Sequence, residues 1–186
     1  MTLNHDLSSM MQKIIYDPLS WIHPQRFSVP SEFVTPRCRS ILNDMVLAHY
    51  ELSTDALNVE DEKERYLVCH WHLIPQVAWM AVCQRYKASL FRYGLWGKLD
   101  SAIQRFALFD IYDTHYEHPS VFSLDELGLL AKHEISLFAC SVSQGLKQRI
   151  PLLFPESREE GDIALYPTEC NDLVMRIAVQ YAKRNH

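Results

Sequence analysis

The sequence predicts a mainly α-helical protein with six to seven helices and little or no sheet. Apolar residues recur at helical spacing in most segments between turn signals. Capping residues stand where these patterns begin, and strand signals are weak. Hydrophobic residues make up 48% of the 186 residues, enough for a packed core. We expect one domain over residues 1–186, with a strap at 13–35, a helical core at 36–147, and a proline loop and last helix at 148–186.

Caps and apolar spacing predict the first helices. Residues 6–15 are expected to form a short helix. Thr35 and Pro36 are typical of an N-cap and a first helical position, and a helix should extend from there to about residue 52. The apolar residues expected to face the core are Leu7, Met10, Met11, Ile14 and Ile15 in the first helix, and Ile41, Met45, Ala48 and Leu52 in the second.

Acidic residues and a proline set the next boundaries. The run Glu60–Glu64 is interpreted as a solvated first turn, because acidic side chains are favourable at a helix N-terminus. This helix should end near His72, and Pro75 should open another that reaches about Tyr93. The stretch Leu67–Gln84 has no charged residue, and we interpret it as core shared by two helices because its histidines and proline would be costly in a membrane.

The second half of the chain predicts three more helices. The first is amphipathic and contains Leu99 and Phe106, and residues 110–122 after it are expected to be a loop. Ser123 and Glu126 form a capping box for a helix to about Lys147, with Leu127, Leu130, Ala131, Glu134, Phe138, Ser141 and Val142 on one broad face. Thr168 should cap the last helix, with Leu173, Val174, Ile177, Ala178 and Tyr181 facing inward.

The segment Ile14–Pro30 differs from the rest of the chain, because three prolines at a spacing of six alternate with aromatic rings. Proline fixes its own φ and keeps the preceding residue out of the α region, so we expect extended backbone and turns. Such a loop stays ordered by laying its rings on a core. The candidate partner-binding residues of this strap are Asp17, Trp21, His23, Arg26 and Phe27.

Structural roles are the alternative for these residues. Asp17 before a proline is typical of a turn-forming or capping acid. His23 is expected to be hydrogen-bonded within the strap, and Trp21 and Pro24 are expected to be structural. A second proline-bounded apolar loop is predicted at Arg149–Ser157.

Charge and cysteine content narrow the class of protein. The net charge of −5 argues against general nucleic-acid binding, which needs a basic surface. The N-terminal residues lack the pattern of a signal peptide. The five cysteines are isolated and odd in number, and we interpret them as buried, reduced thiols of a cytoplasmic protein.

No segment predicts an enzyme, and we assign no catalytic, metal or cofactor-binding residue. Cys69, His70, His72 and Cys83 contain zinc-ligand types, but His70 and His72 point to different sides of a helix. The Asp and His residues of 110–118 could bind a metal for hydrolysis, although a surface loop is the simpler interpretation. Ser141, Ser143 and Gly145 resemble part of a nucleophile elbow, but this segment is expected to lie inside a helix.

Three motifs resemble the OrgA/MxiK family of type III secretion systems. They are IIYDPLSWIHPQR from Ile14, WHLIPQVAW from Trp71 and RIPLLFP from Arg149. Their order and spacing carry the resemblance, which extends over about residues 13–183. Residues 53–65 and 110–122 match nothing in it.

The resemblance implies a non-enzymatic cytoplasmic adaptor on the inner-membrane face of a bacterial sorting platform. It implies two partners, the forkhead-associated-like cytoplasmic domain of the ring protein and the C-ring-like pod protein. The pod connects through a stator to the ATPase. Contact with the membrane would then be indirect, through the ring protein, with no cofactor. A secretion chaperone or regulator and, less favoured, a metal-dependent hydrolase using 110–118 are the alternatives.

Overall fold

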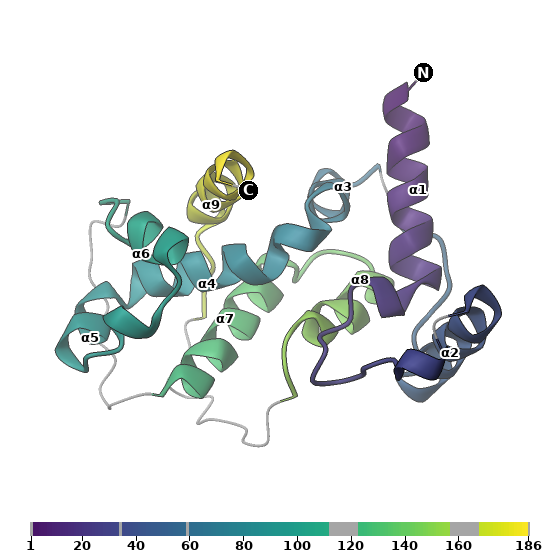
Figure 1. The fold of residues 1–186 in the computed structure, drawn as a ribbon. Coiled ribbons are helices and arrows are strands. Elements are labelled where there is room, and N and C mark those ends of the chain that lie inside the picture. The colour runs from purple at the N-terminus through teal and green to yellow at the C-terminus, as the bar shows by residue number, and fades with distance from the viewer. Residues whose placement is uncertain (1, 34, 59, 112–122, 157–167, 186) are drawn as a thin grey trace. The chain divides into compact units, whose positions relative to one another are not determined.

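The computed structural model describes residues 2–33, 35–58, 60–111, 123–156 and 168–185, and side chains from residue 6 onward. The described residues form nine α-helices and no β-strand (Figure 1), which confirms the mainly α prediction. Their contacts gather into two compact units, each made of two stretches of chain. Unit 1 is Met1–His72 with Ala139–Glu156, and unit 2 is Leu73–Phe138 with Ser157–His186. The single domain stays a prediction.

Unit 1 holds the strap. Its α-helices are α1 (Thr2–Tyr16), α2 (Pro36–His49), α3 (Glu62–Cys69) and α8 (Gln144–Arg149), and short 3-10 helices cover Pro18–Ser20, Ser31–Phe33 and Ile150–Leu153. Helix α1 contacts α2 and α3. One cluster in this unit contains buried Ile22, Val46, Leu52 and Leu152. It joins residues of the strap, of α2 and of the second proline loop.

Unit 2 is built around α4 (Ile74–Arg85). Its other helices are α5 (Lys87–Arg92), α6 (Ser101–Ala107), α7 (Leu124–Phe138) and α9 (Asp172–Arg184). Helix α4 contacts α6, α7 and α9, so neighbours cover several of its sides and most of its residues are buried (Figure 1). The uncharged stretch Leu67–Gln84 is mostly buried, as predicted, and covers the end of α3 and most of α4. The neighbours of α4 account for the burial of its α4 part.

Local capping rules predicted two helix starts correctly. Thr35 accepts a hydrogen bond from the Cys38 amide at its Oγ1 (3.3 Å). The Ser123 amide donates to Glu126 Oε2 (2.6 Å), and the Glu126 amide donates to Ser123 Oγ (3.2 Å). These contacts confirm the N-cap of α2 and the capping box of α7.

Two predicted helices are each divided in two. The helix expected over 75–93 breaks at Tyr86, between α4 and α5. The helix expected to reach Lys147 ends at Phe138, and α8 begins at Gln144. Ser141 is therefore exposed between two helices rather than on a buried helix face. Neither break contains a proline or glycine, so no local signal marked it.

The predicted core face of α2 is wrong for three residues. Ile41 and Met45 are 53% and 57% exposed, and Ala48 is also exposed. The buried residues of α2 are Asn43 and Val46, because α2 turns that side toward the strap. Leu52 is buried as predicted, but it lies after the end of the helix.

The last helix begins later than predicted. Asn171, not Thr168, caps α9, and its Oδ1 accepts from the amides of Leu173 (3.0 Å) and Val174 (3.2 Å). Leu173, in the first turn, is 61% exposed although it was expected to face inward. Val174 and Ala178 are buried as predicted, and Ile177 and Tyr181 are half-buried.

The thiols are more varied than predicted. All five are free, but only Cys83 is buried, and burial raises the pKa of its thiol. Cys140 is exposed, and Cys38, Cys69 and Cys170 are half-buried. The prediction of buried thiols thus holds for one cysteine.

Candidate functional site

The strap begins later than its sequence suggested. Residues 13–16 belong to the last turn of α1, and Tyr16 is exposed rather than laid on the core. A 3-10 turn follows at Pro18–Ser20, and a second one lies at Ser31–Phe33. From Asp17 onward the chain is the proline-punctuated strap that the sequence predicts.

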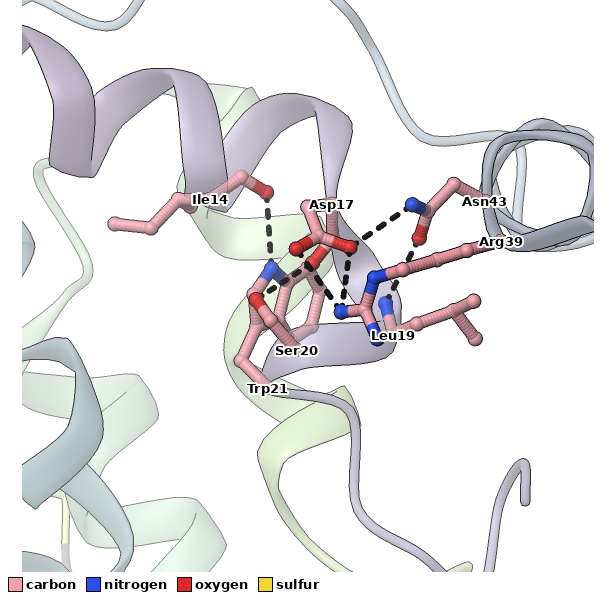
Figure 2. A network of polar contacts seen from close by, with 7 residues as sticks. All are labelled: Ile14, Asp17, Leu19, Ser20, Trp21, Arg39 and Asn43. Atoms are coloured by element: carbon pink, nitrogen blue, oxygen red, sulfur yellow. Dashed lines mark hydrogen bonds and ion pairs between the residues drawn. The ribbon is translucent and has the colours of Figure 1, made fainter. Parts of the chain in front are cut away.

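Asp17 joins the start of the strap to α2. Its carboxylate accepts hydrogen bonds from Arg39 Nη2 (2.9 and 3.0 Å) and from Asn43 Nδ2 (2.9 Å), as Figure 2 shows. Asn43 Oδ1 in turn accepts from the Leu19 amide (3.0 Å). Asp17 makes no side-chain cap, so its role is a tie between two segments. An ion pair this exposed contributes at most about 1 kcal/mol.

Two rings of the strap lie against unit 1. The Trp21 indole Nε1 donates to the carbonyl of Ile14 (3.2 Å, Figure 2). Its ring meets the edge of Trp71 at 5.5 Å between centroids and 88° between planes. An edge-to-face pair adds about 0.5–1.5 kcal/mol beyond the area that it buries. Phe27 packs, half-buried, against the cluster around Val46.

His23 and Arg26 tie the strap to the second proline loop. The His23 amide donates to the carbonyl of Leu152 (2.9 Å). Arg26 donates from Nε to the carbonyl of Phe154 (2.6 Å) and from Nη2 to that of Pro155 (3.3 Å). Burial, and secondly the charge of Arg26, lower the pKa of His23. The first and third sequence motifs are therefore in direct contact.

Arg149 is a central residue that sequence reasoning did not single out. Its side chain is fully buried, and it donates to four carbonyls: Ile14 (3.1 Å), Ile15 (3.1 Å), Gly145 (2.9 Å) and Ser53 (2.8 Å). Two of these carbonyls lie in the last turn of α1, where helix carbonyls lack partners within the helix. Arg149 therefore joins α1, α8 and the segment after α2. Burial lowers the pKa of this guanidinium.

Glu64 is a second such residue. It is buried, which corrects the prediction that Glu60–Glu64 is wholly solvated. Its carboxylate accepts from the Asn58 amide (2.7 Å) and from the amide (2.8 Å) and hydroxyl (2.9 Å) of Ser143. Ser143 occupies the N-cap position of α8, so Ser141 and Ser143 lie outside a helix, contrary to expectation, and only Gly145 lies within one. The hydroxyl that resembled a nucleophile instead donates to a carboxylate.

These contacts make the strap, the loop after Arg149 and the end of α1 one hydrogen-bonded arrangement. The family of bacterial type III secretion apparatus proteins named OrgA/MxiK matches residues 11–184, nearly the whole chain. The chain belongs to the OrgA/MxiK family. Two of the three motifs that resembled this family, the strap and the loop after Arg149, are joined to each other by hydrogen bonds in this OrgA/MxiK protein.

Curated relatives agree with this family. The oxygen-regulated invasion proteins OrgA of Salmonella typhimurium strains 14028s, SL1344 and LT2 are each 29% identical to this chain. The alignments cover 96% of this chain and 89% of each relative. No solved structure matches significantly.

Unit 2 of this OrgA/MxiK protein contains a buried ion pair. Arg85 Nη2 lies 2.7 Å from Glu134 Oε1 and also donates to the carbonyl of Glu169 (3.0 Å). Both side chains are almost completely buried. Glu134 lies on the broad, mostly apolar face predicted for its helix, and a carboxylate among apolar positions is a sequence signal for a buried cation that faces it.

The residues weighed as metal ligands are not brought together in the described part of the chain, where no group of three or more His, Cys, Asp or Glu side chains could hold an ion. Asp110 is exposed and pairs with Lys87 (3.0 Å), and residues 112–118 lie outside the described residues. His70 Nδ1 lies 2.7 Å from the carbonyl of Tyr66. No helix in the described ranges combines the length and apolarity that a membrane crossing requires.

Proposed function

We propose that this OrgA/MxiK protein is a non-enzymatic adaptor of a type III secretion sorting platform. It would lie on the cytoplasmic face of the inner membrane and link the ring protein's cytoplasmic domain to the pod protein. Stator and ATPase would be reached through the pod, and the membrane only through the ring protein. The observation that carries this proposal is the family match over residues 11–184.

The strap is proposed to lie at the end that meets the ring protein. All five candidate residues have inward contacts. Asp17 bonds to α2, Trp21 to α1, and His23 and Arg26 to residues 152–155, while Phe27 packs on the cluster around Val46. These ties fix the backbone and leave Gln25 and Pro24 exposed along one edge. A rigid edge loses little conformational entropy on binding, which favours it as a contact surface.

The test is a titration of the full chain with each purified partner separately. We expect saturable binding to the ring protein's cytoplasmic domain and to the pod protein, each unaffected by prior saturation with the other. Binding to neither partner by a folded, monodisperse chain would contradict the adaptor proposal.

A matched pair of variants separates an interface from a structural strap. Gln25→Glu changes the exposed edge and keeps every strap side-chain bond described above. Arg26→Glu removes two bonds to residues 154 and 155. If the strap is an interface, Gln25→Glu weakens ring binding with an unchanged urea midpoint. If only Arg26→Glu weakens binding, and its urea midpoint falls, the strap is purely structural.

A further inference from the structure

We infer that α5 and the turn after it form a docking platform for an acidic segment of one of the two partners. The platform consists of Phe91, Arg92, Trp96 and Lys98, all in unit 2. The identity of the partner rests on the proposed function, whereas the chemistry of the segment rests on this surface alone.

The platform has an exposed pair of stacked aromatic rings. Phe91 and Trp96 lie 4.2 Å apart between centroids, with 18° between their planes. Phe91 is 52% exposed, and Trp96 is half-buried. Single exposed apolar residues are ordinary on protein surfaces, but a stacked Phe–Trp pair offers a continuous apolar area. Tryptophan and arginine are also enriched among residues that dominate binding energy at interfaces.

The backbone holds this pair in a fixed geometry. Gly94 ends α5 with φ +69°, a conformation that favours glycine. The Leu95 amide donates to the carbonyl of Leu90 (3.0 Å) and the Gly94 amide to that of Phe91 (3.3 Å), the two bonds of a Schellman motif. Leu90 and Leu95 are both buried beneath the turn.

A side chain of α6 anchors the backbone of the turn at Trp96. Gln104 Nε2 donates to the carbonyls of Trp96 and Leu99, both at 2.9 Å. The turn is therefore anchored on both sides of Trp96. A pre-formed apolar surface loses less entropy when a partner covers it than a mobile one would.

Charge indicates the kind of partner. Residues 87–99 contain three basic residues and no acidic residue, although the whole chain has a net charge of −5 and exposed Asp100 follows directly. Lys87 is paired with Asp110 (3.0 Å), so Arg92 and Lys98 are the basic side chains of the platform. Arg92 and Lys98 are exposed, one residue after Phe91 and two residues after Trp96. Complementary charge favours an acidic segment with an apolar side chain that covers the stack. An anionic membrane is less favoured, because recognition by charge takes clusters of about four to eight basic residues.

Two variants test the platform by titration of the full chain with the pod protein and with the ring protein's cytoplasmic domain. Phe91→Ala removes one ring of the stack, and Lys98→Glu reverses a charge at an exposed position. We expect both to weaken binding to the same partner by about tenfold or more. We also expect Lys98→Glu to reduce the salt dependence of that binding.

Leu173→Ala and Lys183→Glu are the matched controls, since both residues are exposed on α9 of the same unit. They should leave both affinities and the urea midpoint unchanged.

Unchanged binding of Lys98→Glu and Phe91→Ala to both partners would overturn the platform while the adaptor function stood. No binding by the wild-type chain would overturn both. Binding to phosphatidylglycerol vesicles that the two variants lose, with partner affinities intact, would assign the surface to a membrane instead.

Discussion

Single residues in unit 1 show how buried charge is accommodated by backbone. Arg149 is met by four carbonyls and Glu64 by two amides and a hydroxyl. A buried charge costs several kcal/mol, on the order of the whole stability of a domain, unless such partners replace its hydration. Each of these side chains therefore makes the position of several segments depend on one residue.

Arg149→Met should destabilise the protein strongly. The substitution keeps an apolar stem but removes the donors to Ile14, Ile15, Gly145 and Ser53. We expect the free energy of unfolding in urea to fall by about 3–5 kcal/mol, as when a buried polar network is broken. The control is Lys147→Met on the exposed side of the same helix, which should change the value by less than about 0.5 kcal/mol. Equal effects of the two variants would contradict the role given to Arg149.

His23 should make stability depend on pH. Its pKa in the folded protein lies below the ordinary histidine value of about 6.5, so below that pH the unfolded state binds more protons. Stability should therefore fall as the pH drops from about 7 through 6.5 and past the lowered folded pKa. His23→Asn should show a smaller drop in urea midpoint between neutral and mildly acidic pH. His49→Asn, at an exposed position of α2, should keep the drop of the wild type.

At the scale of elements, capping was predictable and helix faces were not always so. A cap depends on residues within four positions, so Thr35 and the Ser123–Glu126 box could be predicted from sequence. The face of α2 depends on the strap, which presents Asp17 and Ile22 to Asn43 and Val46. No local feature of the sequence indicates that the side with Asn43 and Val46 is buried and the side with Ile41 and Met45 is exposed.

The same distinction holds for the candidate site. Its rings and prolines indicated an ordered strap, because their chemistry is local. The carbonyls that accept hydrogen bonds from His23 and Arg26 belong to Leu152 and Phe154, more than 120 residues away in the sequence. Only the fold brings these groups together.

Ser123→Ala should weaken α7 by removing its N-cap. The Glu126 amide loses the Ser123 hydroxyl that accepts its hydrogen bond, and the Glu126 carboxylate bonds to a different amide. We therefore expect a loss of about 1 kcal/mol in the free energy of unfolding. Ser136→Ala is the matched control, because the Ser136 hydroxyl only donates back to the Lys132 carbonyl of the same helix. A loss as large for Ser136→Ala would mean that α7 depends on serine content rather than on its cap.

At the scale of the whole molecule, the path of the chain favours one cooperative domain. The chain passes between the two units three times, after His72, after Phe138 and after Glu156. Neither unit is therefore a continuous piece of sequence. Each unit holds together two stretches of chain that the other unit connects. If one unit unfolded, these stretches would no longer be fixed for the other, so we expect the two units to unfold together.

Variants in each unit test this cooperativity. Arg149→Met perturbs unit 1, and Glu134→Ala perturbs unit 2 by leaving Arg85 without the carboxylate that faces it. The readout is alkylation of Cys83, which is buried in unit 2 and should react only when that unit opens. We expect both variants to shift the urea midpoint for Cys83 alkylation to lower concentration, together with the midpoint from circular dichroism. If Arg149→Met shifted only part of the circular dichroism transition and left the Cys83 midpoint in place, the units would unfold separately, and the chain would contain two domains.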